Sequence, residues 1–191
     1  MTAPLTLRRA RTTQAAVLDA PAAAPVITVR AATAADAEAI HALIEANLGD
    51  SRLLPRQRDE IAVHAERFVV AVAGRRVVGC ADLAPLSRHV GEVRSLVVHA
   101  DVRATGIGRR LIAALQQRAT VMGFTALCAF THAPRFFLGR GFSIVPHDWV
   151  PEKINTDCRS CGQFRHCGQF AVLLPLAAAP SAFVPLVSLH G

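Results

Sequence analysis

The feature that most constrains the fold is residues 97–109, where a hydrophobic run leads through a turn into a helix that opens with two glycines. Gly106 and Gly108 let the backbone approach a bulky ligand, because no Cβ atom stands in the way. The first N–H groups of a helix lack intrahelical partners, and the helix dipole favours negative charge beside them. Arg103 and Arg109 add guanidinium groups that suit phosphate oxygens. The segment therefore predicts a cradle for a pyrophosphate.

Two other glycine-rich phosphate motifs fit this segment less well. The dinucleotide fingerprint requires a third glycine where Leu111 stands, and the P-loop requires a Lys-Ser/Thr pair that is absent here. The alternative is a helix N-terminus whose glycines serve only the turn.

The rest of the chain alternates short apolar runs with amphipathic segments. A helix is expected to begin after Thr33, where Asp36 can complete a capping box, and to end at Gly49. The pattern predicts strands over residues 26–29, 68–73, 76–83, 92–99, 124–130, 142–146 and 170–176, and further helices over 57–66, 106–122 and 134–138. This order predicts a mixed α/β sheet in one domain.

Residues 103–108 resemble the R/Q-x-x-G-x-G/A motif of the GNAT acetyltransferases, and residues 136–142 resemble that family's F-Y-x-x-x-G-F segment. The resemblance spans residues 26–176 and implies the GNAT fold, a mixed and mostly antiparallel sheet with flanking helices. Residues 1–25 mix Ala, Pro, Thr and Arg without a sustained period, so a flexible N-terminal arm is expected there. Residues 177–191 are expected to form a C-terminal tail.

The family resemblance implies acetyl-CoA as the cosubstrate. In the family, backbone groups of the fourth strand pair with the pantetheine arm, often beside a bulge, and loop amides take the pyrophosphate. Carried over, this nominates Leu96, Val97, Val98, Arg103, Ala104, Thr105, Gly106, Ile107, Gly108 and Arg109.

Three segments resemble the short N-acetylglutamate synthases within the family. They are the Arg-Leu-Leu-Pro-Arg run of residues 52–56, the Glu-Val-Arg-Ser-Leu run of residues 92–96, and the P-E-K…D-C-x-x-C…C pattern of residues 151–167. The last pattern is the most specific of the three. The resemblance implies that the acceptor is L-glutamate and that the product, N-acetylglutamate, enters arginine biosynthesis.

The acceptor brings two carboxylates and an ammonium group, and arginine suits planar carboxylates. Arg56 and Arg94 are the candidates for the carboxylates, with a structural ion pair as the alternative for each. Glu92 is the candidate general base, acting directly or through water, because period-two alternation places it on the same strand face as Arg94 unless a bulge intervenes. The alternative for Glu92 is an ion pair with a neighbouring arginine. The resemblance assigns Leu54 and His132 to the substrate pocket, with a hydrogen-bonded wall residue as the alternative for His132.

The chain departs from the family at its general acid. Many relatives have a tyrosine where this chain has Phe137, and the chain contains no tyrosine at all. Because a free thiol has a pKa of about 8.5, the departing CoA thiolate needs little help from an acid. We therefore exclude a tyrosine as the general acid, but acetyl transfer itself stays possible.

The cysteines are expected to be reduced thiols. Cys158, Cys161 and Cys167 begin with a C-x-x-C spacing that suits zinc, but a structural loop is preferred and no metal ligand is assigned. Cys80 and Cys128 are expected in core strands.

Composition narrows the partners and the location. The formal charge is +7, but the chain lacks tyrosine and aromatic residues interleaved with basic ones, so nucleic acid is not expected as a partner. Residues 170–190 carry no charge, but recurring prolines argue against a membrane span. A cytoplasmic location is expected, and the oligomeric state, including a homodimer, stays open.

Two rival functions stay open beside glutamate acetylation. One is a GNAT enzyme that acetylates another amine, either a protein N-terminus or a small molecule. The other is a regulatory module that binds acetyl-CoA without turnover.

Overall fold

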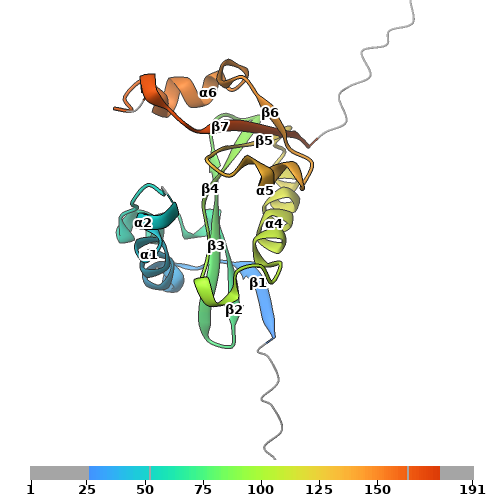
Figure 1. Ribbon diagram of the computed structural model, residues 1–191. Helices are drawn as coiled ribbons and strands as arrows, with labels where there is room; N and C mark the ends of the chain where they lie inside the picture. Colours follow the sequence, from blue (N-terminus) through green and yellow to red (C-terminus); the bar gives the residue numbers. More distant parts are fainter. Residues whose placement is uncertain (1–25, 52, 163, 177–191) are drawn as a thin grey trace, which may run out of the picture.

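The computed structural model describes residues 26–51, 53–162 and 164–176, which form a seven-stranded sheet with helices on both faces (Figure 1). The strands are β1 (Ile27–Ala31), β2 (Phe68–Ala73), β3 (Arg76–Pro85), β4 (Val90–Val98), β5 (Ala126–Thr131), β6 (Ser143–Val145) and β7 (Phe170–Pro175). The α-helices are α1 (Ala37–Glu45), α2 (Leu48–Ser51), α3 (Arg58–Val63), α4 (Ile107–Val121), α5 (Pro134–Leu138) and α6 (Pro151–Lys153), and a π-helical turn, η5 (Ile154–Cys158), continues from α6.

The strand order is β1-β2-β3-β4-β5-β7-β6, and β4–β5 is the single parallel pair in this sheet. The expected GNAT fold, with a mixed and mostly antiparallel sheet, is confirmed. β4 and β5 pair only through residues 90–92 of β4, although β4 continues to Val98. The two strands therefore diverge in the middle of the sheet.

Apolar residues on both faces of the sheet explain why it is covered on both sides. In β2, Val69 and Ala71 pack in the cluster that includes α4, whereas Val70 and Val72 pack in the cluster that includes α1. This is the period-two alternation of a strand. Figure 1 shows α4 and α1 on opposite sides of the central strands.

The start of the first helix agrees with its expected cap, but its end does not. The amide of Thr33 donates to Asp36 Oδ2 at 2.8 Å, and the capping box forms ahead of α1. The expected end at Gly49 is wrong, because α1 ends at Glu45 and Gly49 lies within α2. The side chain of Asn47 donates to the carbonyl of Leu43 at 2.7 Å. This hydrogen bond satisfies a carbonyl in the last turn of α1, so the helix ends ahead of Gly49.

The predicted arm and tail, residues 1–25 and 177–191, lie outside the described residues. Of the uncharged stretch 170–190, the first residues form β7, and the remainder from 177 onward lies in the undescribed tail. No helix within residues 26–51, 53–162 and 164–176 has the length and apolar character needed to cross a bilayer.

Candidate active site

A bulge in β4 changes which side of the sheet its side chains face. Cys80 pairs with Val97 and Asp82 with Arg94, so two β4 residues, Ser95 and Leu96, lie opposite one β3 residue. Ser95 has a φ of +48°, which is uncommon for a residue with a side chain. Val93 therefore packs in the α4 cluster, whereas Val97, four residues later, packs in the α1 cluster.

The bulge divides the site between the two faces of the sheet. Glu92 and Arg94 precede the bulge and lie on the face opposite Val93. Leu96, the second residue of the bulge, and Val98, which follows it, pack against the α4 cluster. Because β4 and β5 diverge beyond residue 92, an opening between these strands connects the two faces. Two ligands, one bound on each face of the sheet, can therefore meet beside the middle of β4.

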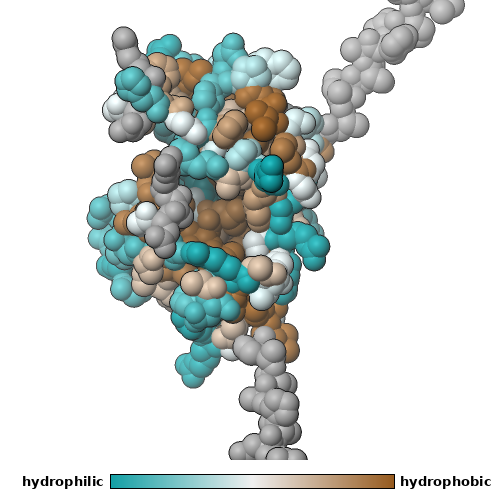
Figure 2. All heavy atoms as spheres, viewed as in Figure 1, coloured by the Kyte–Doolittle hydropathy of each residue, from teal (hydrophilic) through white to brown (hydrophobic). Residues whose placement is uncertain are grey.

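A cleft of about 1290 Å³ occupies this opening, and Figure 2 shows a hollow with apolar residues at its floor and hydrophilic residues around it. Of the residues that the sequence nominates, Val97 alone does not line the cleft, because its side chain is buried against α1. Only its backbone can serve a ligand. The nominated residues that do line the cleft are Leu54, Arg56, Glu92, Arg94, Leu96, Val98, Arg103, Ala104, Thr105, Gly106, Ile107, Gly108, Arg109 and His132.

At one end of the cleft, the turn before α4 has the geometry of an anion cradle. Ala104 and Gly106 have φ values of +62° and +87°, and the Thr105 hydroxyl donates to the carbonyl of Val102 at 2.6 Å. Turns with alternating backbone hand direct successive N–H groups into a concavity. α4 begins at Ile107, so the first N–H groups of this helix face the same region without intrahelical partners. These residues fit a phosphate group.

Arg140 also lines this end of the cleft, although it was not among the residues that the sequence nominated. Its guanidinium lies 3.5 Å from the centroid of the Phe136 ring, and that ring packs so tightly on Gly108 that a Cβ atom there would be 3.1 Å away. Burial and the charge of Arg109 lower the pKa of Arg140. A nearby anion would relieve this repulsion. No local pattern marks Arg140, because Arg109 approaches it only through the packing of α4.

Arg103 mainly braces the turn. Its Nε donates to the carbonyl of Val98 at 3.1 Å, and its Nη2 lies 2.5 Å from Asn47 Oδ1. These contacts connect the end of β4 with the segment after α1. Arg109 and Arg140 are therefore better placed than Arg103 to contribute charge directly.

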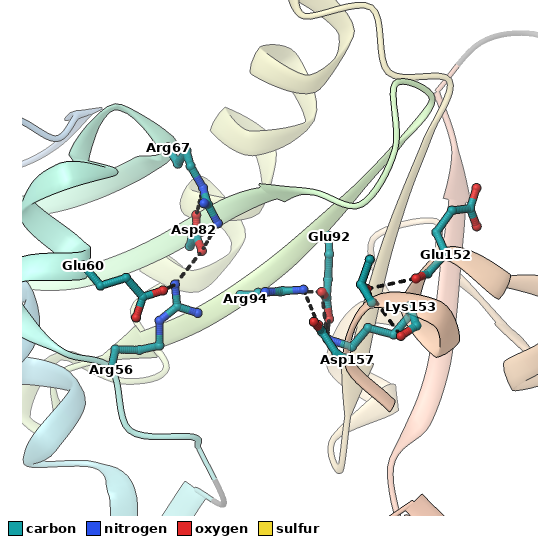
Figure 3. Close-up of polar contacts among 10 residues, drawn as sticks. Arg56, Glu60, Arg67, Asp82, Glu92, Arg94, Glu152, Lys153 and Asp157 are labelled. Carbon is teal, nitrogen blue, oxygen red and sulfur yellow. Dashed lines mark hydrogen bonds and ion pairs between the residues drawn. The ribbon is translucent and has the colours of Figure 1, made fainter. Parts of the chain in front are cut away.

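At the other end of the cleft, four charged side chains form one network (Figure 3). Arg94 donates from Nε to Glu92 and from Nη2 to Asp157 Oδ2, the latter at 2.5 Å. Lys153 Nζ lies 2.7 Å from Glu92 Oε1 and 2.7 Å from Asp157 Oδ2. The expected common face of Glu92 and Arg94 is thus observed. Lys153 and Asp157 belong to the P-E-K…D-C pattern, but the pattern by itself did not indicate that their side chains reach the site.

Burial and charge act in opposite directions in this network. Burial alone would raise the pKa of Asp157, but the hydrogen bond from Lys153 and the charges of Lys153 and Arg94 outweigh it, so that pKa lies below its ordinary value. Burial would likewise lower the pKa of Arg94, yet the carboxylates of Glu92 and Asp157 raise it. Both groups are charged near neutral pH.

A second cluster surrounds the fully buried Asp82, which is the β3 partner of Arg94. Arg67 Nη2 and Arg56 Nη2 lie 3.1 Å and 3.5 Å from Asp82 Oδ2, and Arg56 Nη2 also lies 2.8 Å from Glu60 Oε1 (Figure 3). Burial raises the pKa of Asp82 against the opposing charges of Arg67 and Arg56. Arg56 retains a buried Nε without a hydrogen-bond partner among the described residues. It therefore has a donor left for a further acceptor.

The cysteines divide as expected into core and loop. Cys80 and Cys128 are buried, and burial raises the pKa of Cys80 to about 12. Cys158, Cys161 and Cys167 line the cleft. In the described part of the chain, no three His, Cys, Asp or Glu side chains are arranged to hold a metal ion.

Phe137 and His132 are both wall residues of the cleft. Phe137 is buried and packs edge-to-face on Phe142 at a centroid distance of 5.2 Å. Its ring offers no proton, so it cannot act as the general acid that the family resemblance places at this position. Leu54 is exposed at the rim.

Comparison with known proteins identifies the family of this chain. Residues 64–144 match the model of an acetyltransferase (GNAT) domain. An uncharacterized N-acetyltransferase of Chlorobaculum tepidum, CT2212, is 31% identical over 148 residues, which are 78% of this chain and 96% of that protein. The amino-acid acetyltransferase of Ralstonia nicotianae is 35% identical over 65% of this chain, but the match spans only 28% of that protein.

Solved structures agree with the sequence comparison. N-acetylglutamate synthase from Neisseria gonorrhoeae, complexed with coenzyme A and N-acetyl-glutamate, superposes with a TM-score of 0.71 at 26% identity, over 80% of this chain and 36% of that one. Rv2747 from Mycobacterium tuberculosis, in complex with CoA and NLQ, superposes with a TM-score of 0.66 at 25% identity, over 78% of this chain and 99% of that one. The chain thus spans about a third of the longer synthase and nearly all of the shorter protein.

Proposed function

The chain belongs to the GNAT acetyltransferases, and on that premise we propose that it transfers the acetyl group of acetyl-CoA to the α-amino group of L-glutamate. The products are N-acetylglutamate and CoA. The observation that carries the proposal is the charged network of Glu92, Arg94, Lys153 and Asp157 beside the opening between β4 and β5.

Acetyl-CoA supplies the activated acetyl group as a thioester. The turn of residues 103–106 and the first amides of α4 would hold its diphosphate, and Arg109 and Arg140 would add positive charge there. Leu96 and Val98 would line the pantetheine path through their backbone and through their side chains on the α4 face. Solved relatives that contain CoA support this assignment.

The acceptor end suits a small amino acid with carboxylate groups. Arg94 and Lys153 reach into the cleft from β4 and α6, and Arg56 reaches in from the loop before α3. These cations can hold two carboxylates, one at Arg94 and Lys153 and one at Arg56. An amine without a carboxylate would leave the cations paired only with protein acids. The network therefore favours an acidic amino acid over a simple amine.

Glu92 would remove the proton that the acceptor ammonium must lose before attack. Glu92 is the last residue of β4 that pairs with β5, its side chain lines the cleft, and 4% of that side chain is exposed. The deprotonated amine would attack the carbonyl carbon of the thioester, a C–N bond would form, and the C–S bond would break. Backbone groups that the bulge at Ser95 removes from the regular ladder would stabilise the charge on the carbonyl oxygen.

On attack the nitrogen becomes positively charged, and it loses a second proton as the C–S bond breaks. The departing thiolate would take up this proton or one from water. Phe137 cannot serve as the acid, and the chain contains no tyrosine. Because the pKa of a free thiol is about 8.5, departure without a protein acid costs little near neutral pH.

The cellular role follows from the acceptor. If the acceptor is glutamate, the reaction is the first step of arginine biosynthesis, and a cytoplasmic location is proposed with it. The amino-acid acetyltransferases of Ralstonia nicotianae and Neisseria meningitidis support an amino acid as the acceptor class.

An amine panel tests the proposal. The protein is incubated with acetyl-CoA and one amine at a time, and CoA release is followed with a thiol reagent. Glutamate-dependent release with formation of N-acetylglutamate is the expected result. CoA release with a different amine only, such as a peptide N-terminus, would show that this amine and not glutamate is the acceptor. Tight acetyl-CoA binding with no release for any amine would favour the regulatory alternative.

A further inference from the structure

Asp157 bridges two cations of the acceptor site with a single oxygen atom. Its Oδ2 lies 2.5 Å from Arg94 Nη2 and 2.7 Å from Lys153 Nζ. The two cations stand on separate elements, β4 and α6, yet they are close enough to share one carboxylate oxygen. A carboxylate brought by another molecule would find the same two donors.

We propose that Arg94 and Lys153 bind the α-carboxylate of the acceptor amino acid, and that Asp157 is an internal competitor which this carboxylate displaces. The inference rests on the proposed acetyl transfer to an amino acid and specifies how that amino acid is recognised. Lys153 is the only lysine of the chain, so its charge at this point has no substitute of the same kind.

The two carboxylates of the network differ in how easily they can leave. The Glu92 side chain is 4% exposed and sits within the paired part of β4, whereas the Asp157 side chain is 39% exposed and sits on the π-helical turn η5. Asp157 can turn toward water, and Glu92 cannot. An incoming carboxylate would therefore replace Asp157 and leave Glu92 in place.

This exchange would also position the amine. Glu92 already contacts both cations, Arg94 through Nε and Lys153 through Nζ. In an α-amino acid the amino group is bonded to the carbon next to the carboxylate. A carboxylate held by Arg94 and Lys153 thus places its α-amino group within reach of Glu92, which is the candidate base. The arrangement selects α-amino acids over amines that lack an adjacent carboxylate.

A purely structural Asp157 would behave differently. If Asp157 served only to hold Lys153 and Arg94 in position, its replacement would weaken acceptor binding. If it competes with the acceptor, its replacement would strengthen binding of an acceptor that carries the α-carboxylate and would leave an acceptor without one unchanged. The direction of the change separates the two roles.

Calorimetry on the full chain saturated with CoA makes this comparison without turnover. The titrants are L-glutamate and its α-amide, in which the α-carboxylate is a neutral amide. Asp157→Asn is expected to bind L-glutamate about threefold or more tightly than the wild type, since one competing ion pair is lost, and to bind the α-amide equally. Asp148→Asn, which removes an exposed carboxylate nine residues earlier in the chain, is the matched control and is expected to change neither.

Lys153→Gln is the second variant and guards against a folding defect in the first. It is expected to weaken L-glutamate binding about tenfold and the α-amide far less. With isotope-labelled lysine, the single side-chain ammonium signal of the wild type should shift on addition of L-glutamate, because Lys153 is the only source of it. The α-amide should shift it much less.

Unchanged or weaker glutamate binding by Asp157→Asn would overturn the inference, and so would an equal loss of both titrants in Lys153→Gln. Absence of glutamate binding to the wild-type complex would overturn it as well. Glutamate binding with the expected variant pattern but without CoA release from acetyl-CoA would refute the proposed acetyl transfer and leave this recognition site standing.

Discussion

Lys153 Nζ lies 2.7 Å from Glu92 Oε1, although 61 residues separate the two positions along the chain. The contact joins the helical segment after β6 to the one stretch of β4 that pairs with β5. The candidate base is therefore placed by a residue from the last quarter of the chain. Any variant that disturbs α6 should act on β4 through this ion pair.

Glu92→Gln is expected to lower kcat with glutamate about a hundredfold, because a positioned base contributes at least that much to proton transfer. The KM for acetyl-CoA should change little, since Glu92 lies away from the α4 turn. Steady-state kinetics with thiol detection measures both. Glu38→Gln, which alters an exposed carboxylate of α1 outside the cleft, is the control. A Glu92→Gln enzyme that keeps a third of the wild-type kcat would rule out the base role.

Arg56→Ala is expected to raise the KM for glutamate about tenfold or more, while the KM for acetyl-CoA stays within about twofold, since a charged hydrogen bond to the acceptor is lost. Arg56 is mostly buried and lines the cleft, whereas Arg58 is exposed and pairs with Asp59. Arg58→Ala is thus the matched control and should behave like the wild type. Equal losses for both substrates in Arg56→Ala would remove Arg56 from the carboxylate site.

Arg140→Ala is expected to raise the KM for acetyl-CoA about tenfold with little change for glutamate, because a charged contact to phosphate is lost at the α4 end of the cleft. The effect should shrink as salt is raised, as screening weakens the wild-type contact. Arg110→Ala, on the exposed side of α4, serves as the comparison. If the two variants had the same KM, Arg140 would have no role toward the coenzyme.

Asp36→Asn is expected to lower the free energy of unfolding by about 1 kcal/mol at pH 7, through loss of the ion pair with Arg30, whose Nη2 lies 2.8 Å from Asp36 Oδ1. The hydrogen bond from Arg30 holds the pKa of Asp36 well below its usual range. The ionised carboxylate therefore stabilises the fold fully above the unfolded pKa of about 4 and progressively less as the pH falls below it. Urea unfolding of both proteins between pH 3 and 7 should show the difference narrowing only in the acid range. A difference that persists unchanged at pH 3 would contradict this origin.

Local patterns were enough to predict most elements of the fold. The hairpin strands and α5 agree closely with the expected ranges, and α4 begins one residue after Gly106. Periodicity, turn residues and caps act within a few residues, so the sequence displays them directly. The predicted helix end at Gly49 was wrong because the hydrogen bond of the Asn47 side chain ends α1 earlier.

The division of the cleft could not be derived from alternation alone. A bulge at Ser95 places Val93 and Val97 on opposite faces, and no spacing rule indicates where a strand gains an extra residue. The same applies to Arg140, which reaches the α4 turn only because Gly108 admits the Phe136 ring on which its guanidinium lies.

The sequence by itself determined the turn and helix that would hold a diphosphate, because amides, glycines and arginines of residues 103–109 act within one loop. Only the tertiary structure decided how the acceptor end is built. There, Arg94 and Lys153 share the Asp157 carboxylate across two elements, and Arg56 shares Asp82 with Arg67. Ion pairs between distant segments form when the sheet closes, and their partners are set by packing rather than by neighbours in the chain.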